Sequence, residues 1–185
     1  MRDYGKYRRG TKKTGYQDAD PVNRADDPAA EEKTVRQAEA RALKLLTYHM
    51  MTVHEMQERL TGDGYTPDQT EAAITYCSSF GYLNDRRYAE NYLFSMREKK
   101  SADRIRSELE EKGVDEATIE DVFCENPYDE DDVIYSLICR KAGDPHVFDD
   151  RELRRVYAFL ARKGFGASGI WKGIHRFQDA APTDD

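Results

Sequence analysis

Three glycines near the C-terminus have the spacing of a dinucleotide-binding turn. Gly164, Gly166 and Gly169 lie in "RKGFGASGI" and fit the pattern G-x-G-x-x-G. In nucleotide-binding folds this motif follows a strand and opens a helix, so that the backbone can approach a pyrophosphate. Here the preceding residues, "RELRRVYAFLARK", have the apolar period of a helix, and no acidic residue follows about 20 positions later in a strand. We therefore expect no cofactor at these glycines.

The histidines and cysteines do not form a pattern of metal ligands or catalytic residues. His49 and His54 are five residues apart, whereas the H-E-x-x-H motif of zinc enzymes needs four. Cys77, Cys124 and Cys139 are odd in number and lack C-x-x-C spacing, which disfavours both zinc and disulfides. The sequence also lacks a P-loop and a G-x-S-x-G motif. We expect a protein that is not an enzyme.

The composition indicates what class of protein this is and in which cellular compartment it is expected. Apolar residues make up 38% of the chain and charged residues 35%. No apolar run approaches the ~18 residues that span a bilayer, and residues 1–16 lack the apolar segment of a secretory signal. Together with the unpaired cysteines, this favours a cytoplasmic protein without membrane contact.

Basic residues are unevenly distributed along this acidic chain, whose net charge is −7. Residues 1–16 carry six Lys/Arg and one Asp, and residues 135–178 carry nine Lys/Arg against four acids. The asymmetry fits either a nucleic-acid or acidic-protein partner or merely solvated helix faces. Basic side chains spaced along helices can line a groove that follows a phosphate backbone. The candidate partner-binding residues are Arg86, Arg87, Arg97, Lys99, Lys100, Arg104, Arg106, Arg140, Lys141, Arg151, Arg154, Arg155, Arg162 and Lys163.

The sequence contains an internal repeat of about 50 residues, and the structure of this repeat determines where the basic side chains lie. The segments "RLTGDGYTPDQTEAAI", "ELEEKGVDEATIEDVF" and "FLARKGFGASGIWKGI" align in one register, with glycines 49 and 51 residues apart. A glycine just past a helix supplies the positive φ of a Schellman ending. The same pattern recurs before "YLND". The predicted structural helix caps are Gly64, Gly81, Gly113 and Gly164.

Each copy of the repeat is predicted to contain three helices. Apolar residues such as Ile105 and Leu109 follow a helical period, and Thr66 and Asp115 can cap the helices that start after the glycines. Because one such unit has a small core, we expect neighbours to stack and share apolar surface in an elongated, curved all-α array. The expected parts are a disordered N-terminal arm (1–34), three repeats (35–84, 85–128 and 129–178) and an acidic tail (179–185).

Three longer segments resemble the RecX family, bacterial regulators of the RecA recombinase. They are "ALKLLTYHMMTVHEMQERLTGDGY", "FGYLNDRRYAENYLFSMREKKSADRIRSELEEKGV" and "VYAFLARKGFGASGI", and the resemblance covers about residues 36–178. The resemblance implies three tandem three-helix repeats, which agrees with the glycine register. It also implies a protein that binds RecA filaments on single-stranded DNA and inhibits their ATPase, strand-exchange and co-protease activities. Some members of the family also bind DNA directly.

Departures from the family pattern shift the expected DNA contacts away from the first repeat. Tyr48 and His49 stand where the family often has arginines, and the first repeat is net acidic. We therefore expect the second and third repeats to contact the partner. We also expect the protein to be a monomer. Two other functions remain open: a stand-alone DNA-binding protein of helix-turn-helix type, and a helical scaffold for other proteins. The segment "PDQTEAAITYC" has no Lys or Arg, which disfavours the first of these.

Overall fold

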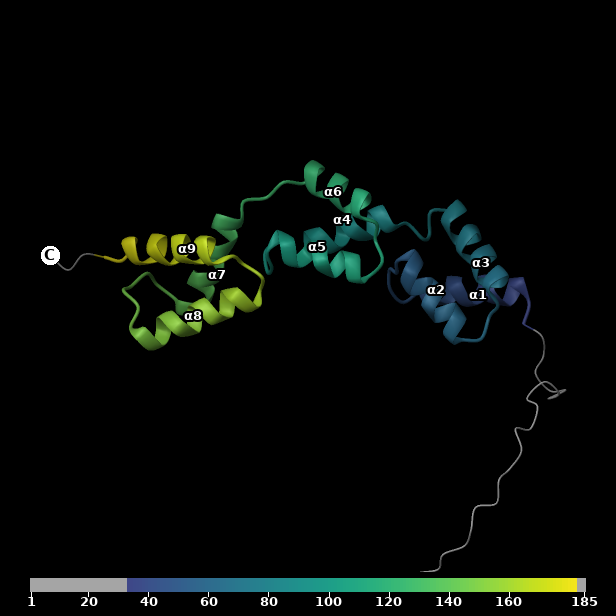
Figure 1. Cartoon of the computed structure of the whole chain (residues 1–185), viewed down its shortest axis with the longest axis horizontal. Helices are drawn as coiled ribbons and strands as arrows, with labels where there is room; N and C mark the ends of the chain where they lie inside the picture. The colour runs from purple at the N-terminus through teal and green to yellow at the C-terminus, as the bar shows by residue number, and fades with distance from the viewer. Residues whose placement is uncertain (1–32, 183–185) are drawn as a thin grey trace, which may run out of the picture. The chain divides into compact units, whose positions relative to one another are not determined.

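A computed structural model describes residues 33–182, which form helices and connecting loops without strands (Figure 1). The prediction of an all-α fold built from three-helix repeats is confirmed. Most of the predicted arm at 1–34, and the end of the predicted tail, lie outside the described residues. No described helix is long and apolar enough to cross a membrane. The helices are α1 (Val35–Leu46), α2 (Val53–Gly62), α3 (Pro67–Ser79), α4 (Asp85–Met96), α5 (Ala102–Glu111), α6 (Glu116–Glu125), α7 (Glu130–Ala142), α8 (Asp150–Arg162) and α9 (Ala167–Asp179).

Polar side chains start the helices where the sequence pattern places them. Thr52 and Thr66 accept hydrogen bonds from the backbone N–H groups three residues later and form capping boxes with Glu55 and Gln69. Asp115 caps α6 through the N–H of Thr118. Thr34 also forms a capping box at the start of α1. These bonds satisfy N–H groups that have no partner inside the helix, and so fix where each helix begins.

The second helix of each repeat ends at a glycine with positive φ. The φ angle is +82° at Gly64, +77° at Gly113 and +93° at Gly164. The following residue donates back to the carbonyl five positions earlier, as from Val114 to Leu109 at 3.1 Å. This is the bonding pattern of a Schellman ending, and it lets the chain reverse into the third helix within a few residues.

Each repeat encloses its own core of buried apolar side chains. The leading and third helices of a repeat pack against each other, as α1 does on α3 and α7 on α9. The buried residues form three separate clusters, represented by Met56 in the first repeat, Ile105 in the second and Phe177 in the third. Each of the three clusters of buried residues comes from one repeat, so the described repeats have no common core.

Polar contacts between helix ends join the repeats instead. The Thr52 hydroxyl at the start of α2 donates to the carbonyl of Lys112 at the end of α5, at 2.7 Å. One repeat further along, the N–H of Ser101 at the start of α5 donates to the carbonyl of Lys163 at the end of α8, at 3.1 Å. The negative end of one helix dipole thus meets the positive end of the next, which is a favourable arrangement.

The end of α2 in the first repeat and the start of α8 in the third repeat have different partners from those at the two junctions. The ammonium of Lys33 donates to the carbonyl of Asp63, the residue that corresponds to Lys112 and Lys163. At the start of α8 the cap is Asp149, whose carboxylate accepts from the N–H groups of its own helix. An ionised carboxylate, unlike the hydroxyl of Thr52, has no proton to donate to a carbonyl. The Asp149 side chain therefore cannot make a bond of the Thr52–Lys112 kind.

Two glycines bring α9 close to α7. A Cβ on Gly173 would lie 2.4 Å from Cγ2 of Ile134, and one on Gly169 would lie 3.1 Å from its Cδ1. Gly166 is the N-cap residue of α9 and Gly164 ends α8. The G-x-G-x-x-G spacing thus arises from a helix stop, a helix start and a close helix–helix contact, and it follows a helix rather than a strand.

Candidate polyanion-binding surface

One helix, α8, carries an apolar face and an opposite face rich in arginine. Asp149 begins the helix and forms a capping box with Glu152. Val156 and Leu160 are buried in the core of the third repeat. Because successive residues turn by about 100°, the side chains on the opposite face point to solvent. This face carries Arg151, Arg154, Arg155 and Arg162.

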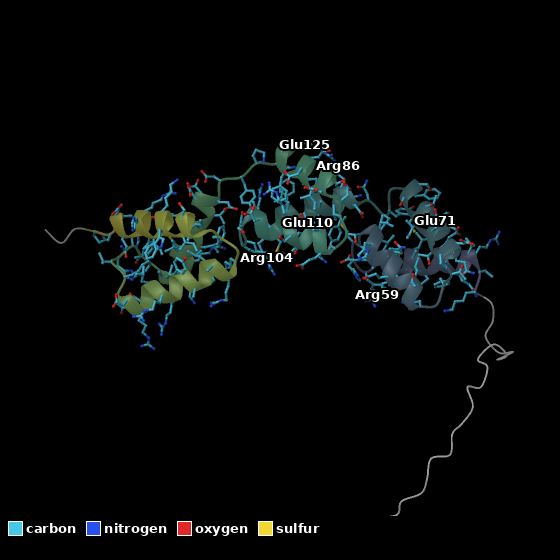
Figure 2. The ribbon with its side chains drawn as sticks, in the orientation of Figure 1. Arg59, Glu71, Arg86, Arg104, Glu110 and Glu125 are labelled. Carbon is cyan, nitrogen blue, oxygen red and sulfur yellow. The ribbon has the colours of Figure 1, made fainter. Side chains whose placement is uncertain are left out.

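A hollow of about 650 Å³ lies over this basic face. It is lined by Lys141 of α7 and by Arg151, Arg154, Arg155, Ala158 and Arg162 of α8. Nitrogen-tipped side chains project from the outer side of α8 in Figure 2. Within the described part of the chain, none of the five cations has a carboxylate partner within 4.0 Å. A concentration of positive charge without direct ion pairs attracts an anionic ligand.

A second group of cations lies beside α8 at the junction of the second and third repeats. Burial lowers the pKa of Lys163, and the nearby positive charges of Arg140, Lys100 and Lys99 lower it further. The ammonium groups of Lys163 and Lys141 lie 4.9 and 5.6 Å from the ring centroid of Phe159. Arg140 also donates to the backbone carbonyl of Glu98 at 3.0 Å. The structure therefore brings these predicted residues together at the end of α8 nearer the second repeat.

Carboxylates of the second repeat bind four of the predicted residues. Arg86 pairs with Glu125, and the two are labelled side by side in Figure 2. Lys100 and Arg104 both bind Glu108, at 2.6 and 2.9 Å. Arg106 binds a carboxylate of α6, that of Glu120, at 2.8 Å and lies over a ring of the same helix. Arg86 and Arg106 join two helices of the repeat, whereas Glu108 is bound from its own helix and the preceding loop. All four cations are paired, so they have less positive charge to offer a partner.

Three further predicted residues have no ion pair among the described side chains but lie outside the α8 hollow. They are Arg87, Arg97 and Lys99. The Arg97 guanidinium lies 4.7 Å from the ring centroid of the exposed Phe94. The predicted residues thus fall into three sets: ion-paired residues of the second repeat, cations without carboxylate partners around α7, α8 and the adjoining junction, and Arg87 and Arg97 of the second repeat, which have no ion pair among the described residues.

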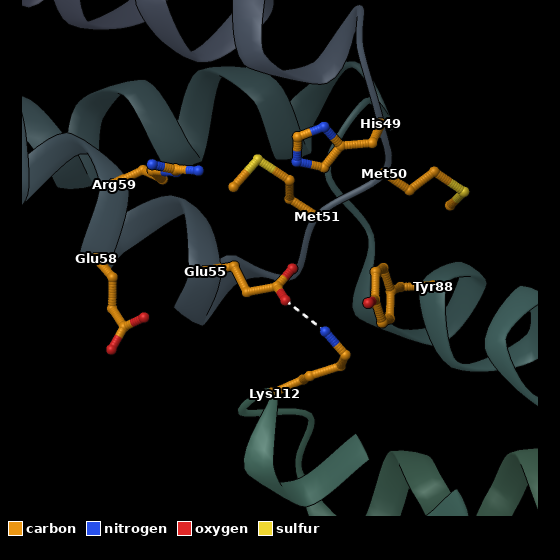
Figure 3. A pocket seen from close by; sticks show the side chains of 8 residues that line it. All are labelled: His49, Met50, Met51, Glu55, Glu58, Arg59, Tyr88 and Lys112. Carbon is orange, nitrogen blue, oxygen red and sulfur yellow. Dashed lines mark hydrogen bonds and ion pairs between the residues drawn. The ribbon is translucent and has the colours of Figure 1, made fainter. Parts of the chain in front are cut away.

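The junction of the first and second repeats contains a mixed-charge hollow that the sequence did not reveal (Figure 3). It has a volume of about 470 Å³ and includes His49, Glu55, Tyr88 and Lys112 in its lining. Glu55 and Lys112 form an ion pair of 2.7 Å across it, and their hydrogen bond raises the pKa of Lys112. This ion pair joins the first and second repeats, while Glu58 and Arg59 add one charge of each sign to the lining.

An aromatic row lies on the outside of the third repeat. The ring centroid of Trp171 lies 5.7 Å from that of Tyr157 and 6.1 Å from that of His175. Trp171 and His175 are four residues apart on one face of α9, a spacing that was visible in the sequence. Tyr157 comes from α8, so its place in the row depends on how the two helices pack.

Comparison with known proteins identifies the family of this chain. Family models of the first and second three-helix domains of RecX match residues 38–77 and 84–122. The regulatory protein RecX of Trichlorobacter lovleyi is 35% identical over 130 residues, or 67% of this chain and 84% of that protein. That of Mycolicibacterium vanbaalenii is 34% identical over 161 residues, or 78% of this chain and 86% of that protein.

Solved structures show the same fold. The crystal structure of RecX from Lactobacillus salivarius matches with a TM-score of 0.60 at 22% identity, covering 80% of this chain and 97% of that one. A second crystal structure, of a regulatory protein RecX, matches with a TM-score of 0.62 at 23% identity, covering 77% and 73%. On the evidence of both sequence and fold, this chain belongs to the RecX family of regulatory proteins.

Proposed function

We propose that this protein regulates the RecA recombinase by binding RecA filaments on single-stranded DNA. Its membership of the RecX family supports a regulatory role, and the resemblance described above implies RecA as the partner. We expect inhibition of RecA ATPase, strand exchange and co-protease activity in the cytoplasm, with the chain acting as a monomer.

The observation that carries the proposal is the basic face of α8, whose arginines make no direct ion pair. Arg151, Arg154, Arg155 and Arg162 line one hollow and have no carboxylate partner among the described residues. A nucleoprotein filament presents phosphates and acidic side chains, both of which bind guanidinium groups through charge-assisted hydrogen bonds. Lys141, Lys163 and Arg140 extend the positive charge toward the second repeat.

The mechanism follows from differential binding. A bound regulator shifts an equilibrium between two filament states only by the difference in its affinity for them. We propose that the chain binds along the filament and favours a state that hydrolyses ATP slowly. The ion pairs of Arg86 and Arg106 join helices of the second repeat, while the α8 face makes the charged contact with the filament.

The test is an ATPase assay of the cognate RecA on single-stranded DNA, titrated with this protein. The expected result is a lower rate of hydrolysis and a shorter filament lifetime at stoichiometric ratios. An unchanged rate and lifetime would refute the proposal. A gel shift with random-sequence duplex tests whether the chain instead acts alone on DNA. Affinity capture of proteins without RecA tests whether it acts as a scaffold.

A further inference from the structure

At both junctions between repeats, the first N–H of a second helix donates to a carboxylate of the next repeat. The N–H of Val53, the first residue of α2, donates to Oδ1 of Asp85 at 2.8 Å. The N–H of Ala102, the first residue of α5, donates to Oε1 of Glu130 at 2.5 Å. Asp85 and Glu130 are themselves the first residues of α4 and α7, the leading helices of the second and third repeats. The same bond between two helix starts therefore recurs at corresponding positions of both junctions.

Each of these carboxylates serves two helix N-termini at once. It belongs to the first residue of one helix and accepts from the first N–H of another. The N–H groups in the first turn of a helix have no partner within the helix and carry a partial positive charge, which an acid stabilises. The side chains of Asp85 and Glu130 are partly buried. Removing either carboxylate would leave a partly buried N–H group without its acceptor, which costs stability at the junction.

The other helix starts lack a bond of this kind. The leading helix of the first repeat begins with the apolar residue Val35. The second helix of the third repeat, α8, is capped from within by Asp149. The N–H groups of Glu116 and Ala167, which begin α6 and α9, have no hydrogen-bond partner within the described part of the chain. Among the described leading helices, only the two that follow another repeat begin with an acid.

We propose that Asp85 and Glu130 are positioning residues, which hold successive repeats in a fixed orientation and so set the place of the α8 face relative to the second repeat. Neither residue lines the hollow over α8. Glu130 acts through α7, the helix that packs on α8 and α9, and so orients the whole third repeat. The consequence for inhibition rests on the proposed function. A chain whose repeats are already oriented loses less conformational freedom when it binds a filament across more than one repeat.

Amide hydrogen exchange of the full chain, followed by NMR without RecA, tests the bonds themselves. The first N–H of a helix ordinarily exchanges fast, because it has no intrahelical partner. The amides of Val53 and Ala102 should exchange at least about tenfold more slowly than those of Glu116 and Ala167. Glu130→Ala should abolish the protection of the Ala102 amide and leave that of Val53 unchanged.

A proline substitution removes the same bond from the donor side. Ala102→Pro deletes the N–H, and proline is well tolerated at the first position of a helix. The preceding residue, Ser101, has φ −69° and ψ 160°, a conformation that a following proline allows. Ala167→Pro is the matched control, because it makes the same change at the start of α9, after Gly166 with φ −70° and ψ 151°. Circular dichroism should show wild-type helix content for both variants.

Inhibition of the RecA ATPase on single-stranded DNA tests the positioning role. Glu130→Ala and Ala102→Pro should each need about three to ten times more protein than wild type for half-maximal inhibition. Glu130→Gln keeps an oxygen that accepts the bond, so it should lie closer to wild type than Glu130→Ala. Ala167→Pro should match wild type.

The outcomes separate this proposal from the proposed function. Fast exchange of the Val53 and Ala102 amides in the wild type, or unchanged protection of Ala102 in Glu130→Ala, would show that the carboxylates do not join the repeats. Wild-type inhibition by both Glu130→Ala and Ala102→Pro would refute the positioning role. A wild-type chain that does not inhibit RecA would refute the proposed function, and the exchange measurement would still decide whether the carboxylates join the repeats.

Discussion

The backbone N–H of Ser101 donates a hydrogen bond to the carbonyl oxygen of Lys163, with an N–O distance of 3.1 Å. The bond joins the start of α5 to the end of α8 and so connects the second and third repeats. A Cβ on the next residue, Gly164, would lie 2.5 Å from the Ser101 hydroxyl oxygen and 2.6 Å from Cβ of Arg104. Glycine is thus needed here both for its positive φ and for the approach of the neighbouring repeat.

Gly113, like Gly164, is needed both for its positive φ and for a close contact with the neighbouring repeat. Alanine at Gly113 should therefore lower the free energy of unfolding more than alanine at Gly81. Both residues have positive φ, +77° and +69°, so alanine costs each about 1 kcal/mol. A Cβ at Gly113 would also lie 2.3 Å from Cβ of His54, whereas one at Gly81 would meet nothing within 4 Å. We expect Gly81→Ala to lower the free energy of unfolding by ~1 kcal/mol and Gly113→Ala by ~2–4 kcal/mol in urea titrations. Equal losses would contradict the tight contact between repeats.

Close packing of α9 on α7 predicts that Gly173→Ala destabilises the third repeat. The added methyl would lie 2.4 Å from Cγ2 of Ile134, which is buried. We expect a loss of ~1–3 kcal/mol in the free energy of unfolding, although alanine favours a helix. Ile134→Ala removes the opposing side chain, so the double variant should lose less than the two single variants together. Strictly additive losses would show that the two residues do not compete for the same space.

A pH dependence is expected from the partly buried carboxylate of Glu108. Burial opposes its ionisation, but hydrogen bonds from Lys100, Tyr92 and Arg104 hold its pKa below the ordinary value of 4.5. A carboxyl whose pKa is lower in the folded state adds stability above its unfolded pKa, and this stability is lost as the pH falls through the folded pKa. Glu108→Gln should therefore flatten the fall in unfolding free energy below about pH 5.

The exposed Glu111 provides the control for this measurement. Glu111 lies on the same helix and has no ion pair among the described residues. Glu111→Gln should reproduce the wild-type profile between about pH 3 and pH 7. If Glu108→Gln keeps the wild-type slope as well, the network around Glu108 does not contribute to acid unfolding.

The sequence was sufficient to predict the helical repeat, because its signals are local. Gly64, Gly113 and Gly164 mark helix ends through backbone conformation, and Thr66 marks a helix start through its own side chain. Gly169 had no explanation from its neighbours in sequence. Its role became clear only from the position of Ile134 on another helix.

The division of the basic residues could not be predicted, because it depends on partners distant in sequence. Arg86 binds Glu125, 39 residues away, and Arg106 binds Glu120, 14 residues away. Nothing in the sequence distinguished them from Arg154 and Arg155, which have no such partner among the described residues. That each repeat has its own core could not be predicted either. The apolar period of a helix shows which of its faces is buried, but not which other helix covers that face.

In the proposed function the basic face of α8 binds the RecA filament, and a comparison of two charge-reversal variants in the ATPase assay tests this contact. The double variant Arg154→Glu, Arg155→Glu reverses two charges in the hollow, whereas Arg36→Glu, Lys44→Glu reverses two exposed charges on α1. With RecA on single-stranded DNA, we expect the α8 variant to need at least about tenfold more protein than wild type for half-maximal inhibition. The α1 variant should match wild type. Equal inhibition by the α8 variant and wild type would contradict the account.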